Sequence, residues 1–173
     1  MNSDIVIIII FTPVPVDYVI ISQEKTAWKP LKERIFEMEY KHVVQYYETD
    51  KMGITHHSNY VRWMEESRVD FLAKIGWPFE RLEQQGFASP VTRLECKFVR
   101  PSTFADVITI YTQVKEFDGV ILTFEYKMEK PDGTVVFVGE SKHCFVNLEG
   151  KPIRADRACP EFCEELQKHK EVK

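Results

Sequence analysis

The most regular pattern in the chain runs from residue 58 to residue 75, where apolar or small side chains recur at spacings of three and four. Such a stripe predicts one long helix with a single buried face, and Trp63 lies at the edge of the stripe. Gly76 and the Trp77-Pro78 pair that follows it are typical of a helix stop. The stripe consists of Tyr60, Met64, Ser67, Phe71 and Ile75.

Strand-like alternation precedes and follows this helix. Residues 37–47 are rich in strand formers and place one set of side chains on a common face: Met38, Tyr40, His42, Val44 and Tyr46. Four longer strand-like segments lie between residues 90 and 148. Asp118-Gly119 and Pro131-Asp132-Gly133 are tight-turn signals between them, which predicts antiparallel neighbours. Two shorter helical segments are expected after residue 78 and from about residue 159 to residue 170.

One helix with a single apolar stripe cannot form a core alone, whereas a curved antiparallel sheet wrapped around it can. The sequence therefore predicts an α+β fold in which about five strands enclose one long central helix. An open sheet of this kind has edge strands that need protection, and pairing of edges between two copies would provide it. We therefore expect a homo-oligomer.

The first 36 residues do not follow this pattern. The segment "DIVIIIIFTPVPVDYVIIS" is apolar, but Pro13, Pro15 and Asp17 interrupt it, and a transmembrane helix needs about 20 mostly apolar residues. It also lacks the basic start of a signal peptide. An added strand, a disordered tail and translated upstream sequence remain open. We expect a single functional domain over residues 37–173, beginning near Met38, without integral membrane association.

Composition and charge narrow the function classes. The chain has 173 residues, 44% hydrophobic and 29% charged, which suits one soluble domain. The formal net charge of −4 does not indicate a general nucleic-acid binder. No CxxC pair occurs among the cysteines, which indicates free thiols in a reducing, cytoplasmic setting rather than metal ligands. These are Cys96, Cys144, Cys159 and Cys163.

The stretch "YYETDKMGITHHSNY", residues 46–60, concentrates polar groups just before the long helix. The first N–H groups of that helix, near His57, Ser58 and Asn59, are unpaired donors at the positive end of the helix dipole. Gly53 permits a tight turn that brings Asp50 back toward those donors. A carboxylate beside such donors is suited to an attack on a carbonyl group whose oxygen the donors hold.

This stretch and the helix after it resemble the signature of 4-hydroxybenzoyl-CoA thioesterase and its YbgC-like bacterial relatives, which have the hotdog fold. The segments "RPSTFADVITIYTQV" and "ESKHCFVNLEGKPIR" also look like later strands of these proteins, so the resemblance covers residues 38–150. It implies hydrolysis of acyl-CoA thioesters without a metal or bound cofactor. It also implies homodimers or homotetramers with sites between subunits.

The resemblance also implies roles for individual residues. Asp50 matches the catalytic carboxylate, and His57 matches the residue at the helix start whose backbone N–H polarises the thioester carbonyl. Tyr46 matches a tyrosine often placed in the same site. Lys51 stands where many relatives have a small residue or proline, and the N-terminal extension is not part of the family pattern.

The chemistry of Asp50 has two open interpretations. An ionised carboxylate can attack the thioester directly and form a mixed anhydride, or it can orient and partly deprotonate a water molecule. The weak basicity of aspartate, whose usual pKa is about 3.9, favours the nucleophile. The positive helix end disfavours a cationic His57, which we expect to be neutral. An ordinary polar loop, with Asp50 as a turn residue, is the alternative without function.

Weaker candidates surround this centre. Gly53, Ser58, Asn59 and Tyr60 would contact substrate, while three basic residues are candidates for the CoA phosphates: Arg93, Lys97 and Arg100. Glu65 and Glu66 are rival acids, although their positions suit a solvated helix face. Trp63 and Met64 are expected in the core.

A metal at Asp50, His56 and His57 is disfavoured because adjacent histidines in one loop point apart. A non-catalytic binding module for acyl-CoA or acyl-carrier protein, and a hotdog hydratase or dehydratase, are the alternative functions.

Overall fold

The computed structural model describes residues 8–9, 19–20 and 38–170. The predictions for the N-terminal extension therefore fall largely outside the described residues. Within the extension, β1 (Ile8–Ile9) and β2 (Val19–Ile20) pair in antiparallel fashion. A domain start near Met38 stays a prediction.

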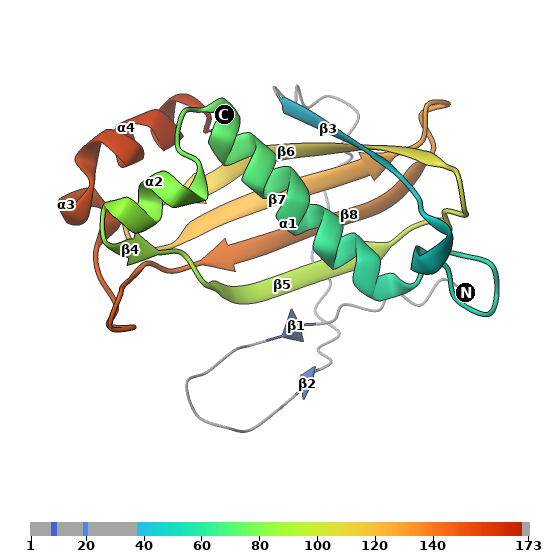
Figure 1. Ribbon diagram of the computed structural model, residues 1–173, viewed down its shortest axis with the longest axis horizontal. Coiled ribbons are helices and arrows are strands. Elements are labelled where there is room, and N and C mark those ends of the chain that lie inside the picture. Colours follow the sequence, from blue (N-terminus) through green and yellow to red (C-terminus); the bar gives the residue numbers. More distant parts are fainter. Residues whose placement is uncertain (1–7, 10–18, 21–37, 171–173) are drawn as a thin grey trace.

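A five-stranded antiparallel sheet carries one long helix across its face (Figure 1). The predicted α+β arrangement of about five strands and one central helix is thereby confirmed. The helix is α1 (His57–Lys74). The strands lie in the order β3 (Met38–Val43), β6 (Val107–Phe117), β7 (Leu122–Glu129), β8 (Val135–His143) and β5 (Val91–Phe98).

The predicted stripe of α1 is buried along its whole length, and Trp63 and Met64 lie in the core as expected. Gly76 ends the helix with a positive φ of 79°, a conformation that glycine adopts without steric cost. Two polar side chains of α1, Asn59 and Arg68, are also buried. The stripe did not predict them, because their polarity favours an exposed position.

The first predicted strand is too long. It ends at Val43, because the next free N–H, that of Gln45, donates to the Glu48 carboxylate at 2.7 Å instead of joining the sheet. Residues Tyr46–Glu48 then form a short 3-10 helix, η2. As a consequence, Tyr46 does not share the face of the strand and its side chain is 77% exposed.

The last predicted strand is also interrupted. β8 ends at His143, and β9 (Val146–Asn147) pairs with β4 (Phe87–Ala88) in a separate small sheet. The helices α2 (Phe79–Gln84), α3 (Ala155–Ala158) and α4 (Pro160–Lys168) gather near the C-terminal end of α1 (Figure 1). Phe162 of α4 packs there against the rings of Trp77, Phe87 and Phe145. The final helix therefore contributes to the core.

The cysteines are free thiols, as predicted, and Cys96, Cys159 and Cys163 are buried. Within the part of the chain that the structure describes, no helix is long and apolar enough to cross a membrane. Residues 44–56 connect β3 to the N-terminus of α1 (Figure 1).

Candidate active site

A tight loop leads from η2 into α1. Thr49 and Thr55 face each other as an antiparallel bridge, and between them the Asp50 N–H donates to the Ile54 carbonyl at 2.8 Å. The Gly53 N–H closes the turn by donating to the Asp50 carbonyl at 2.9 Å. Gly53 has a φ of +75°, in the left-handed region where other residues are strained. The loop therefore returns Asp50 to the start of α1, as the sequence predicted.

His56 caps the N-terminus of α1. Its Nδ1 lies 2.8 Å from the Ser58 hydroxyl and accepts a longer hydrogen bond from the Ser58 N–H at 3.4 Å. The His56 carbonyl accepts from the Asn59 N–H at 3.0 Å. Among the described residues, the His57 N–H has no acceptor. One donor at the positive end of the helix is thus left for a ligand.

The two histidine rings do not point apart. Their centroids are 4.1 Å from each other, because His56 folds over the first turn of the helix to cap it. The expectation that these side chains diverge was therefore wrong. The described residues nevertheless hold no group of three or more histidine, cysteine or acidic side chains suited to a metal ion.

A pocket of about 360 Å³ opens at this helix end. Asp50 and His57 both line it, and Asp50 Oδ1 accepts the Met52 N–H at 2.7 Å. No hydrogen bond to Oδ2 is formed by any described residue. The remaining lining residues are Met52, Ile54, Thr55, Tyr60, Phe98, Val99, Arg100 and Pro101. A mainly apolar wall thus surrounds one carboxylate and one helix terminus.

Hydroxyl groups fix the inner side of this pocket. The Ser102 Oγ lies 2.9 Å from the Tyr60 hydroxyl and 2.7 Å from the Thr55 hydroxyl. The Thr55 N–H donates to the Ser102 carbonyl at 2.8 Å. These contacts join the end of the loop to the connection between β5 and β6, so the pocket walls are held from both sides.

Not every predicted site residue faces the pocket. Tyr46 points outward, and its ring packs edge-on against Phe104 with centroids 5.8 Å apart. Asn59 is turned inward and donates from Nδ2 to the Glu48 carbonyl at 2.7 Å. Arg93 pairs with Glu95 at 2.6 Å. Neither Tyr46, Arg93 nor Lys97 is among the residues that line the pocket. Arg100 is the basic candidate on its rim.

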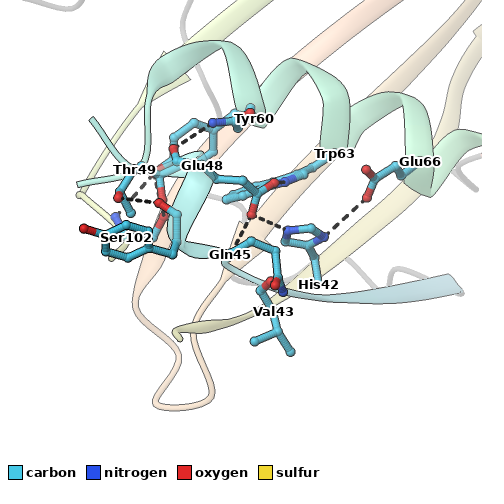
Figure 2. A network of polar contacts seen from close by, with 12 residues as sticks. His42, Val43, Gln45, Glu48, Thr49, Tyr60, Trp63, Glu66 and Ser102 are labelled. Carbon is cyan, nitrogen blue, oxygen red and sulfur yellow. Dashed lines mark hydrogen bonds and ion pairs between the residues drawn. The ribbon is translucent and has the colours of Figure 1, made fainter. Parts of the chain in front are cut away.

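Beneath the loop lies a carboxylate that the sequence reasoning missed. Glu48 is only 5% exposed, and its oxygens receive the Gln45 N–H at 2.7 Å, His42 Nε2 at 2.8 Å and Trp63 Nε1 at 2.8 Å (Figure 2). Burial raises the pKa of Glu48, but these three hydrogen bonds outweigh burial and hold the pKa below its usual value. The capping-box spacing of Gln45 and Glu48 was the available signal.

A second pocket of about 360 Å³ lies beside the middle of α1. There the buried Arg68 guanidinium donates to His143 Nδ1 at 3.2 Å, and His143 Nε2 lies 2.7 Å from the Ser141 hydroxyl. Burial first, and then the nearby Arg68 charge, lowers the pKa of His143 to about 3. The rival acid Glu65 also lines this pocket, together with Phe79, Leu82, Glu83, Phe87, Ala88, Ser89, Pro90, Val91 and Val146.

Comparisons with known proteins show the family and the fold of the chain. The sequence model of the thioesterase-like superfamily matches residues 44–168. A putative esterase of Aquifex aeolicus is 36% identical over 107 residues, which cover 62% of this chain and 83% of that protein. The putative acyl-CoA thioesterase YneP of Bacillus subtilis is 30% identical over 128 residues, covering 73% of this chain and 93% of that protein.

The solved structure of a DHNA-CoA thioesterase from Staphylococcus aureus superposes with a TM-score of 0.72 and 29% identity, over 75% of this chain and 88% of that chain. The expected thioesterase resemblance and the hotdog fold are thereby confirmed.

Proposed function

The chain belongs to the thioesterase-like superfamily, and on that premise we propose that it hydrolyses acyl-CoA thioesters in the pocket between Asp50 and the start of α1. One observation carries the proposal. Asp50, an acidic residue, and His57, whose backbone N–H is uncommitted among the described residues, line the same pocket. The names of its relatives, a putative acyl-CoA thioesterase and a DHNA-CoA thioesterase, support a CoA thioester as substrate.

The helix terminus binds the thioester carbonyl oxygen and makes the carbonyl carbon more electrophilic. The thioester carbonyl oxygen accepts a hydrogen bond from the His57 N–H, and negative charge develops on that oxygen as the carbonyl carbon is attacked. A fixed donor aimed at a developing oxyanion is typically worth about 2.7–4 kcal/mol of barrier lowering. The dipole of α1 acts in the same direction because its positive end faces the oxygen.

Asp50 supplies the attacking group. Its Oδ2 forms a bond to the carbonyl carbon, the carbon–sulfur bond breaks, and CoA leaves as a thiolate that takes a proton from water. Water then cleaves the resulting mixed anhydride, which releases the carboxylic acid and restores Asp50. The alternative, in which Asp50 activates a water molecule for direct attack, uses the same placement. The low basicity of a carboxylate favours the covalent route.

A basic side chain on the pocket rim is suited to bind the phosphates of CoA. Arg100 is exposed on the rim, where its guanidinium contacts a CoA phosphate.

β3 and β5 are the edges of the five-stranded sheet, and sheet extension through an edge gives the homodimer or homotetramer expected from the sequence. Light scattering of the purified full chain tests the assembly, and a monomer at micromolar concentration contradicts it.

Release of free CoA thiol across a panel of aliphatic and aromatic acyl-CoAs tests the activity. The wild type is expected to turn over at least one substrate, and Asp50→Asn is expected to lower kcat by about 100-fold or more. Equal activity of both proteins contradicts the mechanism. Absence of turnover on every thioester, with binding retained in calorimetry, favours a binding module for acyl-CoA or acyl-carrier protein instead.

A single turnover in water enriched in oxygen-18 separates the two routes. If water attacks the mixed anhydride at Asp50 Cγ, the covalent route returns one solvent oxygen to the Asp50 carboxylate, which mass spectrometry of the peptide detects. A labelled peptide supports the covalent route, and an unlabelled peptide after complete turnover excludes attack of water at Asp50 Cγ and counts against that route.

A further inference from the structure

Glu48 connects three separate parts of the chain through one buried side chain. Its Oε2 receives the Gln45 N–H from the residue before η2 and His42 Nε2 from β3. Its Oε1 receives Trp63 Nε1 from the second turn of α1 (Figure 2). Since a carboxylate only accepts hydrogen bonds, His42 is the donor in its contact. The side chain therefore ties β3 and η2 to the central helix.

The main chain of the same residue holds the helix start. The Glu48 carbonyl accepts the His56 N–H at 2.8 Å and Asn59 Nδ2 at 2.7 Å. His56 is the cap of α1, and His57 with its uncommitted N–H follows directly. A shift of Glu48 therefore also shifts the helix terminus that faces the pocket.

Only Thr49 separates Glu48 from Asp50. Thr49 is also held in place, because its Oγ1 donates to the Tyr46 carbonyl at 2.8 Å and its backbone forms a bridge with Thr55. The carboxylate of Asp50 and the N–H of His57 are thus both positioned from Glu48, one along the chain and one through hydrogen bonds. Misplacement of reacting groups by about 1 Å can lower a rate about 100-fold.

An amide cannot replace this carboxylate. If the Nε2 of a glutamine took the place of Oε2, its N–H groups would face the Gln45 N–H. If it took the place of Oε1, they would face the Trp63 indole N–H. In either orientation one donor loses its acceptor, either the part-buried Gln45 N–H or the buried Trp63 indole N–H. The requirement is thus for an anion with acceptors on both sides and not merely for a side chain of this size.

We propose that Glu48 is a positioning residue of the reaction, whose buried carboxylate sets the distance between the attacking Asp50 and the carbonyl-binding N–H of His57. This rests on the proposed thioesterase function. Glu48 does not line the pocket, so it acts through the loop and the helix start and not on substrate.

The test compares Glu48→Gln, Trp63→Phe and the double variant in kcat and KM. Glu48→Gln is expected to lower kcat by roughly 10- to 100-fold while KM stays within about twofold, because the pocket wall is intact and the reacting groups are displaced. Trp63→Phe removes the indole donor. The glutamine Nε2 can then point toward residue 63 without facing another donor. The double variant is therefore expected to have a higher kcat than Glu48→Gln.

Glu66→Gln is the matched control. Glu66 lies at the outer end of the same network, accepts from the Tyr40 hydroxyl at 3.2 Å and lies 3.4 Å from His42 Nδ1 (Figure 2). It touches neither the loop nor the pocket, and a glutamine there retains an acceptor oxygen. The kcat of the Glu66→Gln variant is expected to stay within about twofold of the wild-type value.

Hydrogen exchange of residues 46–57 gives a readout that does not depend on catalysis. Faster exchange of this segment in Glu48→Gln, with unchanged exchange in β6 to β8, supports the proposal. The proposal is overturned by a kcat of Glu48→Gln within twofold of the wild type, by unchanged exchange of the segment, or by a double variant no better than the single one. Were the wild type inactive on every thioester, the proposed function would fail, while the exchange of residues 46–57 would still decide whether Glu48 positions the loop.

Discussion

Two pockets of nearly equal volume, about 360 Å³ each, lie along the central helix, and they differ in the polar groups around them. The first joins the Asp50 carboxylate to the N-terminus of α1. The second places the buried Arg68 guanidinium against a neutral histidine among aromatic and aliphatic side chains. Volume therefore does not distinguish the two pockets; the proposed function rests on the carboxylate of Asp50 and the uncommitted N–H of His57 at the first one.

The two pockets also differ in how their polar groups are held. In the first, Asp50 sits on a short loop whose position depends on contacts with β3, α1 and Ser102. In the second, Arg68 and His143 project from regular elements, α1 and β8. A reactive group on a loop can be moved by a single lost hydrogen bond, whereas a group on a packed helix or strand is held by the core around it.

The largest expected difference lies between Asp50 in the first pocket and Glu65 in the second. Asp50→Asn is expected to reduce kcat by about 100-fold or more. The kcat of Glu65→Gln, in the second pocket, is expected to stay within about threefold of the wild-type value. Steady-state kinetics on the best acyl-CoA measures both. A Glu65→Gln variant as inactive as Asp50→Asn would assign the reaction to the second pocket or make it depend on both.

The next effect concerns acid stability and arises from His143, the buried partner of Arg68 in the second pocket. The pKa of His143 is lowered from 6.5 to about 3. Below pH 6.5 the unfolded chain therefore binds a proton at His143, whereas the folded chain binds it only near pH 3. The stabilisation is complete above pH 6.5 and declines as the pH falls between these values. Between pH 7.5 and pH 5 the loss amounts to about 2 kcal/mol.

Urea unfolding at these two pH values measures that loss, and His143→Gln is expected to abolish most of it. The Glu48 contribution does not interfere, because its pKa is lowered from 4.5 and its stabilisation is lost only as the pH falls below that value. An equal acid loss in His143→Gln and wild type would show that His143 is not the group responsible.

Two glycines at opposite ends of α1 give a smaller and more specific contrast. Gly53 and Gly76 have φ values of +75° and +79°, and in both places an added methyl group would meet open space. Alanine at either position is expected to cost about 1 kcal/mol of unfolding free energy through backbone strain. Only Gly53→Ala is expected to lower kcat as well, by several-fold, since only that turn carries Asp50.

Thermal or urea unfolding together with kinetics separates the two effects of Gly53→Ala. A Gly76→Ala variant with the same loss of kcat would indicate that the rate follows general stability and not the geometry of the loop.

The smallest expected effect concerns the pocket rim. Arg100→Gln is expected to raise KM about threefold with little change in kcat, since one phosphate contact of a solvated guanidinium is weak. The matched variant is Arg93→Gln, because Arg93 already pairs with Glu95. The KM values at low and moderate salt measure the difference, and an equal rise in both variants would contradict a specific role of Arg100.

The sequence predicted the parts of this molecule that follow a local rule. The apolar stripe predicted α1, the glycine after Asp50 predicted the turn, and the helix start predicted an unpaired donor at His57. The expectation of further unpaired donors at Ser58 and Asn59 was wrong, because both N–H groups donate to His56. The sequence did not predict that β3 ends at Val43, because the acceptor that ends the strand is the Glu48 side chain. Burial of Glu48 and of Arg68 was likewise missed, since a charged residue is buried only when tertiary partners surround it, and those partners are distant in sequence.

The most direct test of the central claim is a crystal structure of Asp50→Asn with its best acyl-CoA substrate. The proposed function predicts that the thioester lies in the first pocket, with the carbonyl oxygen at hydrogen-bonding distance from the His57 N–H and the carbonyl carbon next to residue 50. A thioester bound instead between Glu65 and Arg68 would contradict it.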